Sequence, residues 1–159
     1  MKKKATCVVT RGTLEESEHK INCVVINHKN EKIFECGDID KQYCLRSTLK
    51  PFQAATSLNY KTDKKYSLSS KEIAITCASH HGEQKQIETI QSILKKINLS
   101  EKDLECGFHY PLNKKTKKDL YLGKLNQSNV YNNCSGKHAG ILAFIKNLKQ
   151  PTKDYINES

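Results

Sequence analysis

The chain has 159 residues and a formal net charge of +10 at neutral pH, and 36% of its residues are hydrophobic. This length predicts one domain with a single modest core. No apolar run approaches the roughly 20 residues that cross a bilayer, and the basic start lacks the apolar segment of a signal peptide. Seven cysteines at irregular spacing favour free thiols or metal ligands in a reducing compartment. We therefore expect a cytoplasmic protein with no membrane partner.

Lysine supplies nearly all of the positive charge. Only Arg11 and Arg46 are arginines, and arginine is the side chain suited to bidentate contacts with phosphates and bases. The lysines are scattered apart from two short runs, which is typical of a solvated surface. The composition therefore argues against a nucleic-acid partner and indicates that each arginine lies where a planar, forked donor is needed.

Short β-branched runs open the chain, and a turn at "NHKN" between the second and third predicts a hairpin or a meander. These runs are "TCVVTRG", "KINCVVIN" and "KIFECGD". The first helix is expected to start at Ser47 or Thr48, because Pro51 is tolerated in the first turn of a helix but not in its interior.

Further helices follow at intervals along the chain. Ser69 and Glu72 have the spacing of a capping box, and residues 83–99 place isoleucine and leucine on one helical face. Residues 113–126 are lysine-rich and are expected to form a surface loop, whereas a turn followed by an apolar helix is predicted over 132–148. The polar tail adds no strand, so we expect residues 1–159 to be the N-terminal portion of a single larger domain.

Ser47 and Lys50 have the Ser-x-x-Lys spacing of a serine nucleophile and a lysine base. The spacing carries little weight alone, because three such pairs occur, about the number expected at random from the serine and lysine content. Position distinguishes this pair: it lies at a predicted helix start, next to Arg46 and just before Pro51. We therefore interpret Ser47 and Lys50 as candidate catalytic residues.

Two further clusters contain chemically active side chains. In "CASHHGE" (77–83), Ser79 is either a second active-site hydroxyl or part of a helix cap. In "NNCSGKHAG" (132–140), a thiol, a lysine and a histidine lie at a helix N-terminus, where free N–H groups attract anions and lower a cysteine pKa. This cluster predicts a metal site, a site for a substrate carboxylate, or a capped helix with a buried cysteine.

Taken together, six ordered segments of the chain resemble the thermolabile, rhizobial-type L-asparaginases of the L-asparaginase II family. These segments are "TRGTLEESEH", "ECGD", "RSTLKPFQA", "EIAITCASHHGE", "DLECGFHYP" and "NNCSGKHAGILA". The resemblance implies an α/β sandwich like that of the serine β-lactamases and serine-dependent glutaminases, with an N-terminal meander followed by helices. It also implies hydrolysis of the small-molecule substrate L-asparagine to L-aspartate and ammonia.

The resemblance also assigns residues to roles. The catalytic residues of the family match Ser47, Lys50 and Ser79, and which serine attacks stays open. The residues that line its substrate pocket match Arg46 and His138. Its zinc ion is bound by a cysteine and a lysine that match Cys134 and Lys137.

Members of the family are about twice as long as this chain. The resemblance therefore implies that a third zinc ligand and a second catalytic lysine lie outside it, and that a homodimer forms if the full domain is present. The alternative is an inactive remnant that keeps these motifs without catalysis of its own.

Overall fold

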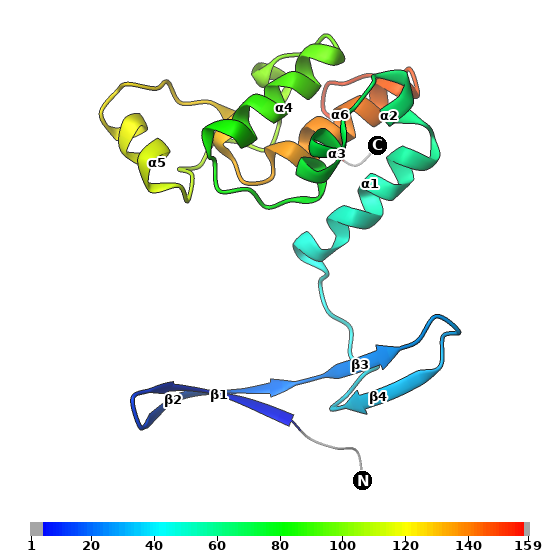
Figure 1. The fold of residues 1–159 in the computed structure, drawn as a ribbon, viewed down its shortest axis with the longest axis vertical. Coiled ribbons are helices and arrows are strands. Elements are labelled where there is room, and N and C mark those ends of the chain that lie inside the picture. The colour runs from blue at the N-terminus through cyan, green and yellow to red at the C-terminus, as the bar shows by residue number, and fades with distance from the viewer. Residues whose placement is uncertain (1–4, 158–159) are drawn as a thin grey trace. The chain divides into compact units, whose positions relative to one another are not determined.

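The computed structural model describes residues 5–157, which fall into two compact units that divide between Cys44 and Leu45. The regular elements of the first unit are strands and those of the second are helices (Figure 1). Within the described range, two small antiparallel sheets and six α-helices are formed, which confirms the expected mixture of α and β structure. None of these helices is long and apolar enough to cross a membrane.

Two hairpins make up the first unit. The strands are β1 (Ala5–Arg11), paired antiparallel with β2 (Leu14–Ile21), and β3 (Cys23–Ile26), paired antiparallel with β4 (Lys32–Cys36). The turn between β3 and β4 lies where the sequence predicts it. Its geometry is stabilised by the Asn27 side chain, whose oxygen accepts the backbone N–H groups of Lys29 and Glu31.

The predicted strand "KINCVVIN" is divided at Asn22, and the residues before it belong to β2, a strand that the sequence did not indicate. The Asn22 side-chain oxygen accepts the backbone N–H of Asp38 at 2.8 Å. Gly37 lies against this side chain with φ +73°, and a Cβ there would be 2.2 Å from the Asn22 oxygen. Only glycine therefore fits this position without displacement of Asn22.

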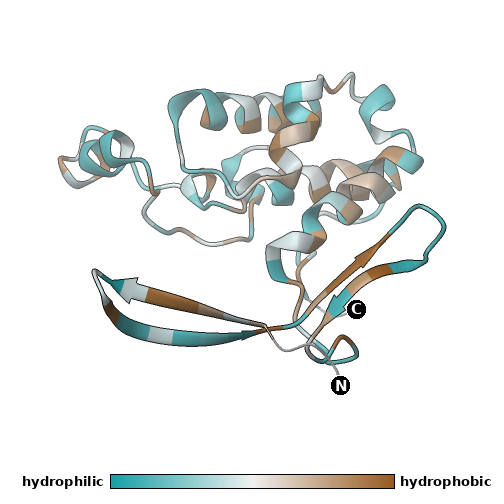
Figure 2. Ribbon diagram, turned by 60° about the horizontal axis from the view of Figure 1, so that its bottom comes forward, coloured by the Kyte–Doolittle hydropathy of each residue, from teal (hydrophilic) through white to brown (hydrophobic). Residues whose placement is uncertain are grey.

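Large apolar side chains on these strands are mostly exposed. They include Val8, Val9, Val24, Val25, Ile33 and Phe34. Figure 2 shows the corresponding hydrophobic stretches along the hairpins. Among the described residues of the first unit only Cys36 is buried. Because an isolated two-stranded hairpin is at best marginally stable in water, this unit does not bury a core of its own.

The second unit is a group of helices around α6. Its α-helices are α1 (Lys50–Asn59), α2 (Thr62–Lys65), α3 (Ser70–Cys77), α4 (Gln84–Lys96), α5 (Lys114–Tyr121) and α6 (Ser135–Asn147). Short 3-10 helices are η1 (Arg46–Leu49), η2 (Glu101–Asp103) and η3 (Asn129–Tyr131). Helix α6 packs against α1, α3 and α4 (Figure 1). The core lies between these helices and includes Ile75, Ile90, Ile93, Leu94, Leu104, Val130 and Leu142.

The amphipathic helix predicted over residues 83–99 is confirmed as α4, and its predicted apolar face is buried. The predicted capping box at the start of α3 is also confirmed. Ser69 accepts the backbone N–H of Glu72, and the Glu72 carboxylate accepts the N–H of Ser69. Each of these helices thus begins where the sequence places its start.

The Glu72 carboxylate also joins α3 to α4. It accepts a hydrogen bond from Ser92 at 2.8 Å and forms a 2.6 Å ion pair with Lys96. Burial by itself raises the pKa of Glu72, but the Lys96 ammonium and the hydrogen bonds from Ser69 and Ser92 lower it to about 2. The carboxylate is therefore ionised at neutral pH and pairs two helices of the core.

The prediction of a loop over residues 113–126 is wrong for its first part, because residues 114–121 form α5. The side chain of Asn113 accepts the backbone N–H of Thr116 and so caps the helix. Thr116 and Leu120 are buried one turn apart. Lysine itself is a good helix former, so this capped segment forms a helix although its exposed face is highly charged.

Candidate active site

The segment with Ser47 and Lys50 combines two kinds of helix. Arg46 to Leu49 form the 3-10 helix η1, and Lys50 opens α1, with Pro51 in its first turn as expected. Arg46 has φ +49°, the left-handed region that non-glycine residues adopt rarely. The predicted helix start at Ser47 is therefore a 3-10 turn, and the α-helix begins three residues later.

Lys50 is buried, with 3% of its surface exposed, and its Nζ atom has hydrogen-bond partners in the segment just after α3. Its Nζ atom donates to the carbonyl oxygen of Ala78 and to the Oγ atom of Ser79, each at 2.8 Å. The Ser79 hydroxyl in turn donates to the Oγ atom of Ser47 at 3.2 Å. The structure thus brings together all three side chains that the sequence suggested as catalytic.

The order of these contacts differs from what the spacing alone suggests. Ser47 and Lys50 are three residues apart in sequence, but Ser79 lies between their polar atoms as the common hydrogen-bond partner. Hydroxyl groups can both donate and accept, so a row of amine, hydroxyl and hydroxyl can pass a proton along its length. Ser79 is consequently part of the Ser-Lys cluster, which favours the active-site interpretation over that of a helix cap.

Ser79 is placed by the chain that leaves α3. The helix ends at Cys77, and Ala78 is extended, with φ −87° and ψ 155°. The backbone N–H of His80 then donates to the carbonyl oxygen of Asn133 at 3.1 Å, which fixes this segment beside the turn before α6. The position of Ser79 is therefore held from both sides.

His80 strengthens this connection through its side chain and was not predicted. Its Nδ1 atom accepts the backbone N–H of Gly82, so Nε2 carries the proton and donates to the Oγ atom of Ser135 at 2.8 Å. The Ser135 hydroxyl donates onward to the carbonyl oxygen of Val130. Burial, with a smaller effect from the charge of Lys50, lowers the pKa of His80 to about 4. His80 is thus a neutral, buried connector between α3 and α6.

The backbones of α3 and α6 come very close at this point. A Cβ built on Gly136 would lie 2.3 Å from the carbonyl oxygen of Ile75. One turn later a Cβ on Gly140 would lie 2.8 Å from the Cγ2 atom of Thr76. These two glycines allow the N-terminus of α6 to approach the C-terminal half of α3, and with it Ser79.

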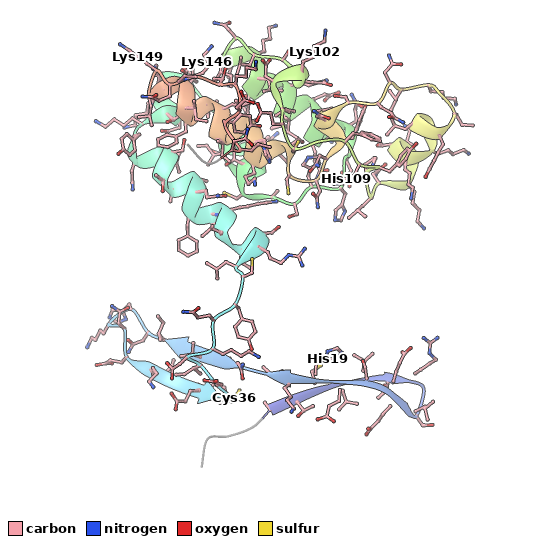
Figure 3. The ribbon with its side chains drawn as sticks, turned by 180° about the vertical axis from the view of Figure 1, so that it is seen from behind. His19, Cys36, Lys102, His109, Lys146 and Lys149 are labelled. Carbon is pink, nitrogen blue, oxygen red and sulfur yellow. The ribbon has the colours of Figure 1, made fainter. Side chains whose placement is uncertain are left out.

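Cys134 and Lys137 lie at the N-terminus of α6, with Cys134 at the cap position. The backbone N–H of Cys134 donates to the side-chain oxygen of Asn132, and that of Asn133 donates to the Nε2 atom of His109 at 3.0 Å. His109, labelled in Figure 3, belongs to the loop before α5. The turn that carries the predicted metal ligands is therefore fixed by side chains from two segments.

A second thiol, that of Cys106, belongs to the same neighbourhood. Burial raises the pKa of Cys106 to about 11, with smaller electrostatic effects from Cys134 and Lys137. The Cys106 thiol donates to the carbonyl oxygen of Asn129. Within residues 5–157, no group of three or more histidine, cysteine and carboxylate side chains is arranged to hold a metal ion.

The two residues predicted to line a substrate pocket have different environments. His138 is nearly buried, and its Nδ1 atom lies 2.7 Å from the hydroxyl of Tyr155. Burial, followed by the charges of Lys137 and Lys50, lowers the pKa of His138 to about 4. Arg46 is exposed and forms no ion pair with any described residue, so its guanidinium can bind a carboxylate from solution.

An apolar cavity of about 220 Å³ opens between α1, α3 and α6. Lys137 and Thr76 contribute to its lining, but Ser47, Lys50 and Ser79 do not. The cavity is thus adjacent to the start of α6 and separate from the Ser-Lys cluster.

Comparison with known protein families supports the motif interpretation over nearly the whole chain. The family model named L-asparaginase II matches residues 7–159. No curated protein matches the chain. The matched range includes every residue of the Ser-Lys cluster and of the turn before α6. On this evidence the chain is a member of the L-asparaginase II family.

Proposed function

We propose that the chain takes part in the hydrolysis of L-asparagine to L-aspartate and ammonia. The observation that carries the proposal is the hydrogen-bonded row of Lys50, Ser79 and Ser47 in a chain of the L-asparaginase II family. A nucleophilic hydroxyl needs a base within hydrogen-bond reach, directly or through a relay. The row supplies a hydroxyl, a relay and an amine at distances of 2.8 and 3.2 Å.

The proposed reaction begins when neutral Lys50 accepts a proton. Ser47 attacks the side-chain amide carbon of asparagine, its proton passes to Ser79, and Ser79 passes its own proton to Lys50. Lys50 then returns a proton to the departing nitrogen, which leaves as ammonia, and an acyl-enzyme on Ser47 remains. Water hydrolyses this ester, releases L-aspartate and restores the Ser47 hydroxyl.

Substrate orientation is assigned to two residues. The exposed Arg46 guanidinium would bind the α-carboxylate of asparagine as a charge-assisted, bidentate pair. The charge of Lys50 acts on His138. This histidine would contact the substrate through its ring. Arginine at residue 46 is consistent with this role because the sequence otherwise uses lysine for its positive charge.

Zinc is the metal that the family resemblance implies, and the donor chemistry of the turn before α6 fits it in part. Cys134 supplies a thiolate and Lys137, which would bind as the neutral amine, supplies a nitrogen donor. Two donors do not complete the four-coordinate shell of zinc, so further ligands have to come from water or from other residues. When bound, zinc would add positive charge beside the substrate site.

We also infer that the chain has the α/β sandwich fold of the serine β-lactamase type that the family resemblance implies. The exposed apolar side chains of β1 to β4 support this inference, because strands with that surface need a covering layer.

The same exposed strands favour a second candidate, a chain that keeps the motifs but does not turn over asparagine alone. Ammonia release from L-asparagine by the purified chain, with and without zinc, separates the two candidates. Lys50→Met should abolish the release, since loss of a general base costs about 10²- to 10⁴-fold. Lys20→Met in the exposed Ser17/Lys20 pair is the matched control and should leave it unchanged. A folded chain without any ammonia release would contradict the first candidate.

A further inference from the structure

Tyr155 lies in the segment after α6, which the sequence indicates only as a polar tail. Its ring packs against the hydrophobic core and lies edge-on to the imidazole of His138, with ring centroids 5.6 Å apart. The neighbouring backbone N–H of Asp154 donates to the carboxylate of Glu105 at 2.8 Å. The tail is therefore fixed against the loop that follows η2 and against the first turns of α6.

The hydrogen bonds of the Tyr155 hydroxyl have one consistent direction. Its oxygen accepts the backbone N–H of Glu105 at 3.0 Å and lies 2.7 Å from the Nδ1 atom of His138. A backbone N–H can only donate, so the phenol oxygen is an acceptor toward Glu105. The phenol hydrogen then finds its acceptor in Nδ1 of His138, and Nδ1 is the unprotonated ring nitrogen.

The other ring nitrogen of His138 is left for a ligand. Nε2 has no hydrogen-bond partner among residues 5–157. Every described side-chain nitrogen or oxygen that is fully buried does have such a partner. Nε2 therefore keeps some contact with solvent, and with Nδ1 unprotonated it bears the ring hydrogen. His138 presents an N–H group to whatever binds beside it.

We propose that Tyr155 is a positioning residue that holds His138 in the tautomer with hydrogen on Nε2, as a donor to an oxygen of the bound substrate. The part of this inference that concerns substrate rests on the proposed asparagine hydrolysis. The tautomer itself follows from the contacts of Tyr155, Glu105 and His138 and does not depend on turnover. No sequence motif assigns a role to Tyr155.

The experiment measures the imidazole nitrogen resonances of His138 by ¹⁵N NMR in the full chain and in Tyr155→Phe. The full chain should show an unprotonated Nδ1 and a protonated Nε2. Tyr155→Phe keeps the ring packing but removes the hydroxyl, so the Nδ1 signal should move toward the value of a mixed tautomer. Tyr131→Phe, another partly buried tyrosine packed against the same core, is the control and should leave the His138 signals unchanged.

A kinetic measurement adds the substrate. Tyr155→Phe should lower kcat/KM for asparagine by about tenfold, the value of one hydrogen bond that is no longer held in place. A protonated Nδ1 in the unmodified chain would overturn the proposal, as would an unchanged tautomer in a folded Tyr155→Phe. If the chain lacks asparaginase activity but shows the expected tautomers, the proposed function fails while the positioning role of Tyr155 stands.

Discussion

Gly136 on α6 and Ile75 on α3 meet backbone against backbone, with only 2.3 Å from an ideal Cβ on Gly136 to the carbonyl oxygen of Ile75. Backbone atoms of two packed helices cannot move aside as a flexible side chain can. We therefore predict that Gly136→Ala destabilises the fold by about 1–3 kcal/mol through overpacking, although alanine is the better helix former. Urea denaturation followed by circular dichroism measures the change.

Two further variants calibrate this prediction. Gly140→Ala should cost less than Gly136→Ala, because its new methyl group meets the Thr76 side chain instead of a carbonyl group. Lys71→Ala on the exposed face of α3 should leave the free energy of unfolding nearly unchanged. Equal stability of Gly136→Ala and the unmodified chain would show that α3 and α6 are farther apart than described.

The Glu72–Lys96 pair predicts a loss of stability in acid. The pKa of Glu72 falls from an ordinary value of 4.5 to about 2 in the folded chain, so its stabilisation is complete above about pH 4.5 and is lost as the pH falls toward 2. Because Lys96 is one-third exposed, solvent screening reduces the effect to about 1–2 kcal/mol. Unfolding free energies at about pH 5 and pH 3 should differ less in Glu72→Gln than in the unmodified chain. Glu88→Gln, an exposed position of α4, should retain the full difference.

His80 predicts a second, earlier acid transition. Its pKa is lowered from 6.5 to about 4 by burial and by the charges of Lys50, His109 and His81. Between about pH 4 and pH 6.5 the His80 ring is protonated in the unfolded chain but neutral in the folded chain. The free energy of unfolding therefore falls as the pH drops from about 6.5 to about 4. Full burial of the ring makes this worth about 2–3 kcal/mol.

The measurement is urea denaturation between about pH 7 and pH 4 for the unmodified chain and His80→Gln. The slope of unfolding free energy against pH should be smaller in the variant, while part of it persists because the pKa of His138 is also lowered to about 4. His28→Gln in the exposed turn before β4 is the control. An unchanged slope in His80→Gln would mean that His80 is already protonated in the fold.

Zinc binding is predicted to depend on the turn before α6. Cys134→Ser and Lys137→Met should each lower zinc affinity by at least about tenfold, because each removes a ligand or its charge. Equilibrium dialysis with zinc measures the affinity, and Cys7→Ser at an exposed position of β1 is the matched thiol control. Equal losses of zinc affinity in Cys7→Ser and Cys134→Ser would show that zinc binds to thiols of the chain without a specific site.

Local signals in the sequence were sufficient for several elements. The capping box at Ser69, the apolar face of α4 and the position of Pro51 depend on neighbours within one or two turns, and the structure confirms them. Strand β2 and helix α5 were missed because their charged residues conceal the pairing and capping contacts that form them. The Asn113 cap is itself a local signal for the start of α5, whereas β2 depends on its pairing with β1.

In the candidate site too, motifs identify some of the residues, whereas the contacts between them depend on the fold. Ser47, Lys50 and Ser79 were found as motif residues, but the order of their hydrogen bonds depends on how the end of α3 meets the start of α1. His80 could not be distinguished from its neighbour His81 by sequence, because only its burial beside Ser135 gives it a role. Tyr155 lies 17 residues from His138 in a polar tail, without any pattern to connect them.

The bond from Lys50 to the carbonyl oxygen of Ala78 has a consequence for the direction in which this amine can act. A neutral amine has two hydrogens and one lone pair, and a carbonyl oxygen can only accept. While Ala78 holds one N–H, rotation about the end of the lysine side chain is restricted, and the lone pair can turn toward Ser79. In the proposed reaction, the carbonyl of Ala78 would thus hold the amine beside Ser79, the hydroxyl from which Lys50 would take a proton.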